Sequence, residues 1–110
     1  MSDASPPDAL GDSTTERQLL TVIAESVLES RLIDDVKRAG AKGYSVGHVR
    51  GEGATGRAAL DFAGPSVRLE AVVTEEVAQR VLGVLRRDYF PNYAVVAWVA
   101  PVRVARPERF

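Results

Sequence analysis

The chain has 110 residues and a net charge of −1 at pH 7, so its length indicates one domain and its charge gives no bulk electrostatic basis for nucleic-acid binding. It contains no cysteine, which excludes disulfide bonds and thiolate metal sites. No apolar run is long enough to cross a bilayer, and no basic stretch followed by an apolar core marks a secretory signal. We therefore expect a cytoplasmic protein.

The first 16 residues differ in composition from the rest of the chain. Four acids are scattered through them: Asp3, Asp8, Asp12 and Glu16. A polar segment of this kind buries too little apolar surface to offset the entropy that is lost on ordering. The sequence predicts a disordered tail over residues 1–16, with a docking tail as the alternative, and a folded domain over residues 17–110.

The first half of the domain has the pattern of a strand followed by a helix. Residues 18–24 form a short apolar run, which predicts a strand. Ser26 with Glu29 forms a capping box and predicts a helix N-terminus at Ser26. Apolar residues then recur at helical spacing: Leu28, Leu32, Ile33, Val36 and Ala39. Gly40 suits the position just beyond the C-terminus of that helix.

The middle of the chain is rich in glycine, because six of the nine glycines lie between Gly40 and Gly56. Residues 44–50 are predicted to be the second strand. Residues 66–73 alternate between apolar and polar side chains and are predicted to be the third. The loop between them, residues 51–65, is far longer than the roughly two to five residues of most hairpin loops, and long loops inside compact domains are often functional.

A second helix and a fourth strand complete the domain. Thr74 is a good N-cap, and the acids that follow it favour a helix N-terminus. The apolar stripe of this helix comprises Val77, Val81, Val84 and Leu85, with Ala78 and Leu82 beside it. We expect the helix to end near Asp88, a turn over residues 89–92 and a strand over residues 93–100.

The order of elements is β-α-β-β-α-β, which predicts an α+β protomer with the ferredoxin-like arrangement. Right-handed crossovers place both helices on one face of its antiparallel sheet. The strands at residues 18–24 and 93–100 carry apolar side chains on both faces, and a strand of that kind is buried on both. Two helices cover only one face, so we infer that the other face packs against further subunits.

Two segments resemble motifs of a known family. One is Gly-Ala-Lys-Gly-Tyr-Ser-Val at residues 40–46, and the other is Tyr-Phe-Pro-Asn-Tyr at residues 89–93. Together they resemble the helix-to-strand turn and the Tyr-Phe-x-x-Tyr turn of the PII-like signalling superfamily. The resemblance is closest to the PII-like proteins associated with bicarbonate transporters or carboxysomes, and it covers residues 19–102.

The resemblance implies a homotrimer that binds adenine nucleotides in clefts between subunits. It also implies that the family's T-loop, here residues 51–65, responds to ligand and controls a bicarbonate transporter or an enzyme of carbon metabolism. PII nitrogen regulators cradle polyphosphate in a glycine-rich loop after the second helix, whereas this chain has the glycine-free turn at residues 89–92. AMP, ADP or cyclic AMP is therefore favoured over ATP, with bicarbonate as a candidate second ligand and no covalent cofactor.

The resemblance also nominates nucleotide-binding residues. They are Gly43, Ser45, Arg50, Gly51, Gly53, Arg57, Arg103 and Arg106. The glycines and the serine match positions near the adenine or at the start of the T-loop. The arginines lie beside that loop or after the last strand, and their planar guanidinium groups suit phosphate. The alternative is turn geometry for the glycines and a solvated surface for the arginines.

The same residues argue against other functions of this fold. His48 is the single histidine, and without a cysteine or a second histidine it completes no metal site, which argues against a metal-tolerance trimer of the same fold. An acylphosphatase-like enzyme needs an anion-binding loop after the first strand, where residues 25–28 form an acidic cap instead. We expect no catalytic residues. A purely structural trimer without a small-molecule ligand stays as an alternative.

Overall fold

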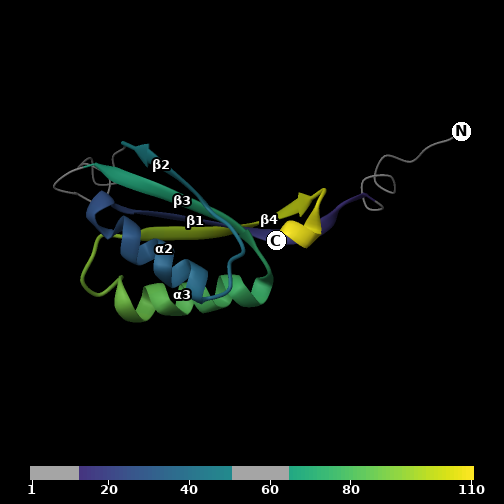
Figure 1. Ribbon diagram of the computed structural model, residues 1–110. Helices are drawn as coiled ribbons and strands as arrows, with labels where there is room; N and C mark the ends of the chain where they lie inside the picture. The colour runs from purple at the N-terminus through teal and green to yellow at the C-terminus, as the bar shows by residue number, and fades with distance from the viewer. Residues whose placement is uncertain (1–12, 51–64) are drawn as a thin grey trace, which may run out of the picture.

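The computed structural model describes residues 13–50 and 65–110. Four antiparallel strands form one sheet in the order β2-β3-β1-β4, and both helices lie on the same face of it (Figure 1). This arrangement confirms the predicted ferredoxin-like α+β protomer. In chain order the elements are β1 (Thr15–Glu25), η1 (Ser26–Leu28), α2 (Glu29–Arg38), β2 (Ser45–Val49), β3 (Ser66–Val73), α3 (Glu75–Asp88), β4 (Val96–Val104) and η3 (Pro107–Arg109).

The hydrophobic core lies between the helix layer and the sheet. Alternate residues of β1 are fully buried there, beginning with Leu20 and Val22, and their neighbours on β3 are Ala71 and Leu69. The helices contribute the buried side chains of Leu32, Val36, Val77, Ala78, Val81 and Leu85. The apolar stripes seen in the sequence are therefore the faces that the helices turn toward the sheet.

The end of α2 forms a Schellman motif. The backbone N–H of Gly40 donates to the carbonyl of Lys37 at 3.0 Å, and that of Ala41 donates to the carbonyl of Val36 at 3.3 Å. Gly40 has φ of 117°, a left-handed conformation that favours glycine. The prediction that Gly40 lies just past the helix is confirmed.

The start of the first helix differs from the prediction. Residues Ser26–Leu28 form a 3-10 turn, and neither that turn nor α2 has a side-chain cap at its N-terminus. The backbone N–H of Ser26 instead donates to the carbonyl of Pro65 at 2.9 Å. The predicted cap at Ser26 is wrong because a contact with the segment before β3 replaces the local capping box.

Strand boundaries also differ at the two ends of the domain. β1 begins at Thr15, inside the segment predicted as a tail, and residues 1–12 lie outside the described residues. β4 begins at Val96 rather than residue 93 and continues through Pro101 to Val104. Proline is compatible with β4 because β4 is an edge strand, in which only alternate N–H groups face the neighbouring strand.

The sheet face opposite the helices is partly apolar, as predicted from the two-sided strands. Trp98 and Val96 of β4 are 45% and 37% exposed on that face. Thr21 of β1 is fully buried between them and β3, and its hydroxyl donates to Oε2 of Glu70 at 3.0 Å. Arg68 also bonds to Glu70 at 3.2 Å and stacks over the Trp98 ring at 5.9 Å. None of the helices in the described part of the chain is long and apolar enough to cross a membrane.

Candidate functional site

A cavity of about 630 Å³ lies between the β2–β3 edge of the sheet and the C-terminal turn. Its walls come from parts of the chain that are far apart in sequence. The lining residues are Leu19, Lys42, Gly43, Tyr44, Ser45, Glu70, Ala71, Val72, Arg106, Arg109 and Phe110. The long β4 strand makes this possible, because it pairs with β1 as far as Val104 opposite Thr15 and so delivers the last residues to the cavity.

The charge of the cavity is predominantly positive. Among the described residues of its wall, Lys42, Arg106 and Arg109 are basic and Glu70 is the one acidic side chain. The Glu70 carboxylate already accepts hydrogen bonds from Thr21 and Arg68 on the helix-free face of the sheet. Arg106 also lies 3.8 Å from the exposed carboxylate of Glu108. The basic side chains of the wall outnumber its acidic ones, and this arrangement suits an anionic ligand such as a phosphate group.

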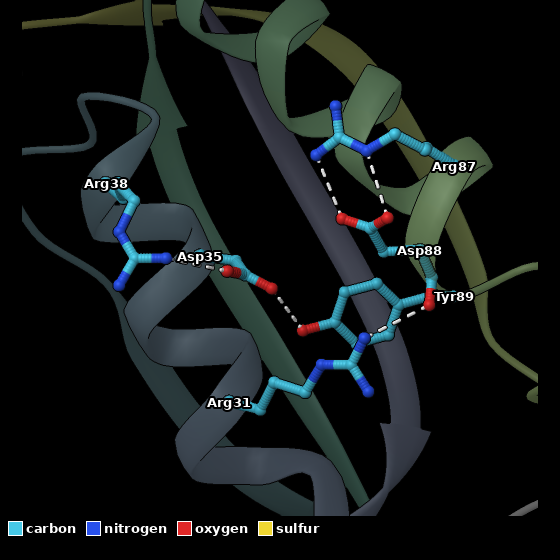
Figure 2. Close-up of polar contacts among 6 residues, drawn as sticks. All are labelled: Arg31, Asp35, Arg38, Arg87, Asp88 and Tyr89. Carbon is cyan, nitrogen blue, oxygen red and sulfur yellow. Dashed lines mark hydrogen bonds and ion pairs between the residues drawn. The ribbon is translucent and has the colours of Figure 1, made fainter.

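The turn between α3 and β4 is held rigidly against α2. Tyr89 is fully buried, and its hydroxyl donates to Oδ2 of Asp35 at 2.6 Å (Figure 2). Burial, followed by this hydrogen bond, raises the pKa of the Tyr89 hydroxyl above its ordinary value. The guanidinium of Arg31 lies over the rings of Tyr89 and Tyr93, at 4.5 and 5.5 Å from their centroids. The two tyrosines of the 89–93 motif thus fix the turn to the first helix.

Comparison with known proteins now assigns the chain. The sequence model of the family described as Nitrogen regulatory protein P-II matches residues 17–109. The chain belongs to the P-II family. The resemblance stated from residues 40–46 and 89–93 is confirmed. The chain matches no curated protein.

Solved structures of PII-like proteins share this fold. The chain is 46% identical to a PII-like signalling protein from Thermus thermophilus, with a TM-score of 0.76 over 89% of this chain and 98% of that one. It is 25% identical to CPII from Thiomonas intermedia bound to ADP and bicarbonate, with a TM-score of 0.76 over 88% and 96% of the chains. Another structure of CPII, bound to ADP, AMP and bicarbonate, is 26% identical, with a TM-score of 0.70 over 88% and 99%.

The structure gathers some of the nominated residues and separates others. Gly43, Ser45 and Arg106 line the cavity. Arg103 does not line it, since its Nε donates to Oγ1 of Thr14 at 2.8 Å. Arg50 follows β2 as an exposed residue that is not part of the cavity wall. Three nominated residues lie outside the described residues: Gly51, Gly53 and Arg57.

Several lining residues were not nominated from the sequence. Lys42 and Tyr44 belong to the 40–46 motif itself, so the motif could have nominated them along with Gly43 and Ser45. Arg109 lies in the arginine-rich C-terminal segment, from which the resemblance nominates Arg103 and Arg106 alone. Glu70 gave no signal, because an acid on the polar side of a strand is usually a solvated residue. Within the described residues, no group of His, Cys, Asp or Glu side chains could hold a metal ion.

Proposed function

We propose that this P-II family chain is a regulatory protein that binds an adenine nucleotide in the cavity between residues 42–45 and the C-terminal turn. The observation that carries the proposal is the meeting of that motif with Arg106 and Arg109. The family resemblance places Gly43 and Ser45 near the adenine, and the guanidinium groups of Arg106 and Arg109 beside them suit phosphate. ADP or AMP is favoured, since those nucleotides are bound in the CPII structures, and cyclic AMP stays as an alternative.

The proposed assembly is a homotrimer in which the helix-free face of the sheet is covered by other copies of the chain. Trp98 and Val96 present apolar surface there, and a large exposed apolar patch usually marks an interface. The cavity would then receive a further wall from a neighbouring subunit. Arg50, with Gly51, Gly53 and Arg57, would contribute from the base of the loop.

The proposed output is control of a partner through the loop at residues 51–65. A ligand can shift a loop between two conformations only by as much as its affinity differs for the two. A transporter of bicarbonate or an enzyme of carbon metabolism is the proposed partner, and bicarbonate is a proposed second ligand because CPII binds it together with ADP. The chain is proposed to act in the cytoplasm and to have no catalytic activity of its own, with a disordered segment before the folded domain.

Thermal unfolding of the full chain with single ligands tests the proposal. The ligands are AMP, ADP, ATP, cyclic AMP and bicarbonate, and then each nucleotide together with bicarbonate. A ligand at about 100 times its Kd stabilises the native state by roughly 2.7 kcal/mol, which raises the Tm by several degrees in a domain of this size.

Guanosine diphosphate is the matched control for the base. A shift with ADP or AMP and none with guanosine diphosphate supports adenine recognition. Equal shifts with both would mean that only the phosphates are bound. If no nucleotide moves the Tm of a protein that sediments as a trimer, the ligand-free structural trimer becomes the better interpretation.

A further inference from the structure

A second concave site lies on the helix layer, in the groove between α2 and α3. Its volume is about 510 Å³. It is lined by Asp35, Arg38, Ala39, Arg80, Gly83, Val84, Arg87 and Asp88. Figure 2 shows four of these side chains: Asp35 and Arg38 of α2, and Arg87 and Asp88 of α3. The groove shares no lining residue with the nucleotide cavity. It therefore needs a physical account of its own.

Each of the three arginines of the groove contacts another group of the protein. Nε of Arg80 donates to the carbonyl of Ala39 at 2.9 Å, from α3 across to the end of α2. Arg87 donates through two nitrogens to the carboxylate of Asp88, at 2.9 Å each, and Arg38 lies 3.5 Å from Asp35. A guanidinium has five N–H donors, so each arginine keeps donors that these contacts do not use.

The two acids of the groove are already compensated. Oδ2 of Asp35 accepts the hydroxyl of Tyr89, and Asp88 accepts both bonds from Arg87. The hydrogen bond from Arg87 lowers the pKa of Asp88, so this carboxylate stays ionised and keeps its arginine oriented. The arginines outnumber the aspartates, and the side chains of Arg38 and Arg87 are 78% and 71% exposed. The groove therefore presents oriented donors with an excess of positive charge to solvent.

An ordinary explanation accounts for only part of this surface. Cations in the last turn of a helix interact favourably with its dipole, and this explains Arg38 and Arg87, as it explains Lys37 and Arg86 beside them. It explains Arg80 only in part, because the Nε of Arg80 caps the carbonyl of Ala39 at the end of α2, while Arg80 itself lies in the middle of α3 and keeps N–H donors that this cap does not use. The bridge by Arg80 converts two basic helix ends into one continuous groove.

We propose that the α2–α3 groove is a docking site for an acidic segment of a partner protein. Guanidinium groups match carboxylates with paired hydrogen bonds, and groups that are already oriented lose less entropy on binding. The site lies on the helix side of the sheet, so it stays accessible when other copies cover the opposite face. It is separate from the nucleotide cavity and goes beyond the proposed function.

The test uses the full chain and a short labelled peptide of alternating glutamate and serine. Amide chemical shifts from NMR are expected to move on peptide addition at Ala39, Arg80 and Arg87. The double variant Arg38→Gln with Arg80→Gln removes one arginine from each helix. It is expected to weaken peptide binding roughly three- to ten-fold, the effect of two surface charge contacts.

The matched control is the double variant Lys37→Gln with Arg86→Gln, which removes the same charge from the same two helices outside the groove. It is expected to bind the peptide as the wild type does. Equal weakening in both variants would show bulk charge attraction and overturn the proposal, as would shifts that map to Lys42, Arg106 and Arg109. The response of the Tm to ADP is expected to be unchanged in both variants. A negative result for peptide binding at the groove is therefore distinct from a negative result for nucleotide binding at the cavity.

A further comparison tests whether the chain's own acidic segment occupies the groove. Removing residues 1–12 without any peptide is expected to leave the groove amides unmoved. If their shifts change on this truncation, the occupant is the chain itself, and the proposal of a partner is overturned.

Discussion

The hydroxyl of Tyr89 donates a hydrogen bond of 2.6 Å to Asp35, and this contact joins the α3–β4 turn to the middle of α2. Arg31 reinforces it from the other side, because its guanidinium lies over the Tyr89 ring and donates to the carbonyl of Asp88 at 3.2 Å. Asp35 also lines the α2–α3 groove. A turn that is part of the family motif therefore also organises the surface between the two helices.

Replacing Tyr89 with Phe should lower the free energy of unfolding and change how it depends on pH. At neutral pH the loss is expected to be about 1–3 kcal/mol, because the partly buried Asp35 loses a donor. The pKa of Tyr89 is raised in the folded state, so the neutral phenol is the form that stabilises the fold. Its contribution is fully present below the unfolded pKa of about 10 and decreases as the pH rises above it.

Urea unfolding of the wild type and the Tyr89→Phe variant across neutral and alkaline pH measures this, at one fixed protein concentration. The difference between the two proteins should be constant up to about pH 10 and shrink above it. Tyr93→Phe is the control, since the Tyr93 hydroxyl accepts a longer bond of 3.3 Å from exposed Arg31. A difference for Tyr89→Phe that does not change with pH would contradict the role given to the neutral phenol.

Two glycines should respond to alanine in opposite directions. Gly40 has φ of 117°, and a Cβ there would lie 3.2 Å from both Nη2 of Arg80 and Cγ2 of Val77. Gly40→Ala is expected to destabilise the fold by about 1–3 kcal/mol. Gly83 is in the middle of α3 with no heavy atom within 4 Å of a Cβ, so Gly83→Ala is expected to stabilise by about 0.5–1 kcal/mol. Denaturant unfolding of both variants measures these changes in stability. A Gly40→Ala variant as stable as the wild type would contradict the strain expected for alanine at this positive φ.

Elements encoded by local signals could be predicted to the residue. The alternation over Ser66–Val73 gives β3, and Thr74, whose hydroxyl accepts the N–H of Val77 at 3.3 Å, gives the start of α3. The predictions failed where a distant partner decides the structure. Ser26 bonds to Pro65 instead of capping a helix, and Pro101 lies inside β4 because the strand is at the sheet edge.

The same limit explains which parts of the candidate site the sequence could predict. Gly43 and Ser45 lie within a recognisable motif, so they could be nominated without a structure. The choice between Arg103 and Arg106 depends on how far β4 extends and where the chain turns after it. Because β4 continues to Val104, Arg103 stays in the strand and bonds to Thr14, whereas Arg106 reaches the cavity wall.

Trp98→Glu should dissociate the proposed trimer. Trp98 is 45% exposed on the helix-free face in a single chain, and a carboxylate in its place would lose the apolar contact area and bring a charge into the interface when copies associate. Sedimentation velocity at micromolar concentration should give a trimer for the wild type and a monomer for this variant. Val27→Glu is the matched control, since Val27 is 79% exposed in η1, away from the sheet. A monomeric wild type, or dissociation by Val27→Glu alone, would contradict the interface.

Arg106→Gln should weaken ADP binding, whereas Arg103→Gln should not. The two changes remove the same charge from the same C-terminal segment, but only Arg106 lines the cavity. Its exposed guanidinium is 3.8 Å from the exposed carboxylate of Glu108, a weak surface ion pair that a bound phosphate can replace. A charge-assisted contact at such a site is worth roughly a five- to ten-fold change in Kd, which calorimetric titration resolves.

Equal weakening by both variants would mean that the segment acts through its total charge. Weakening by Arg103→Gln alone would move the phosphate site away from the cavity to the outer end of β4.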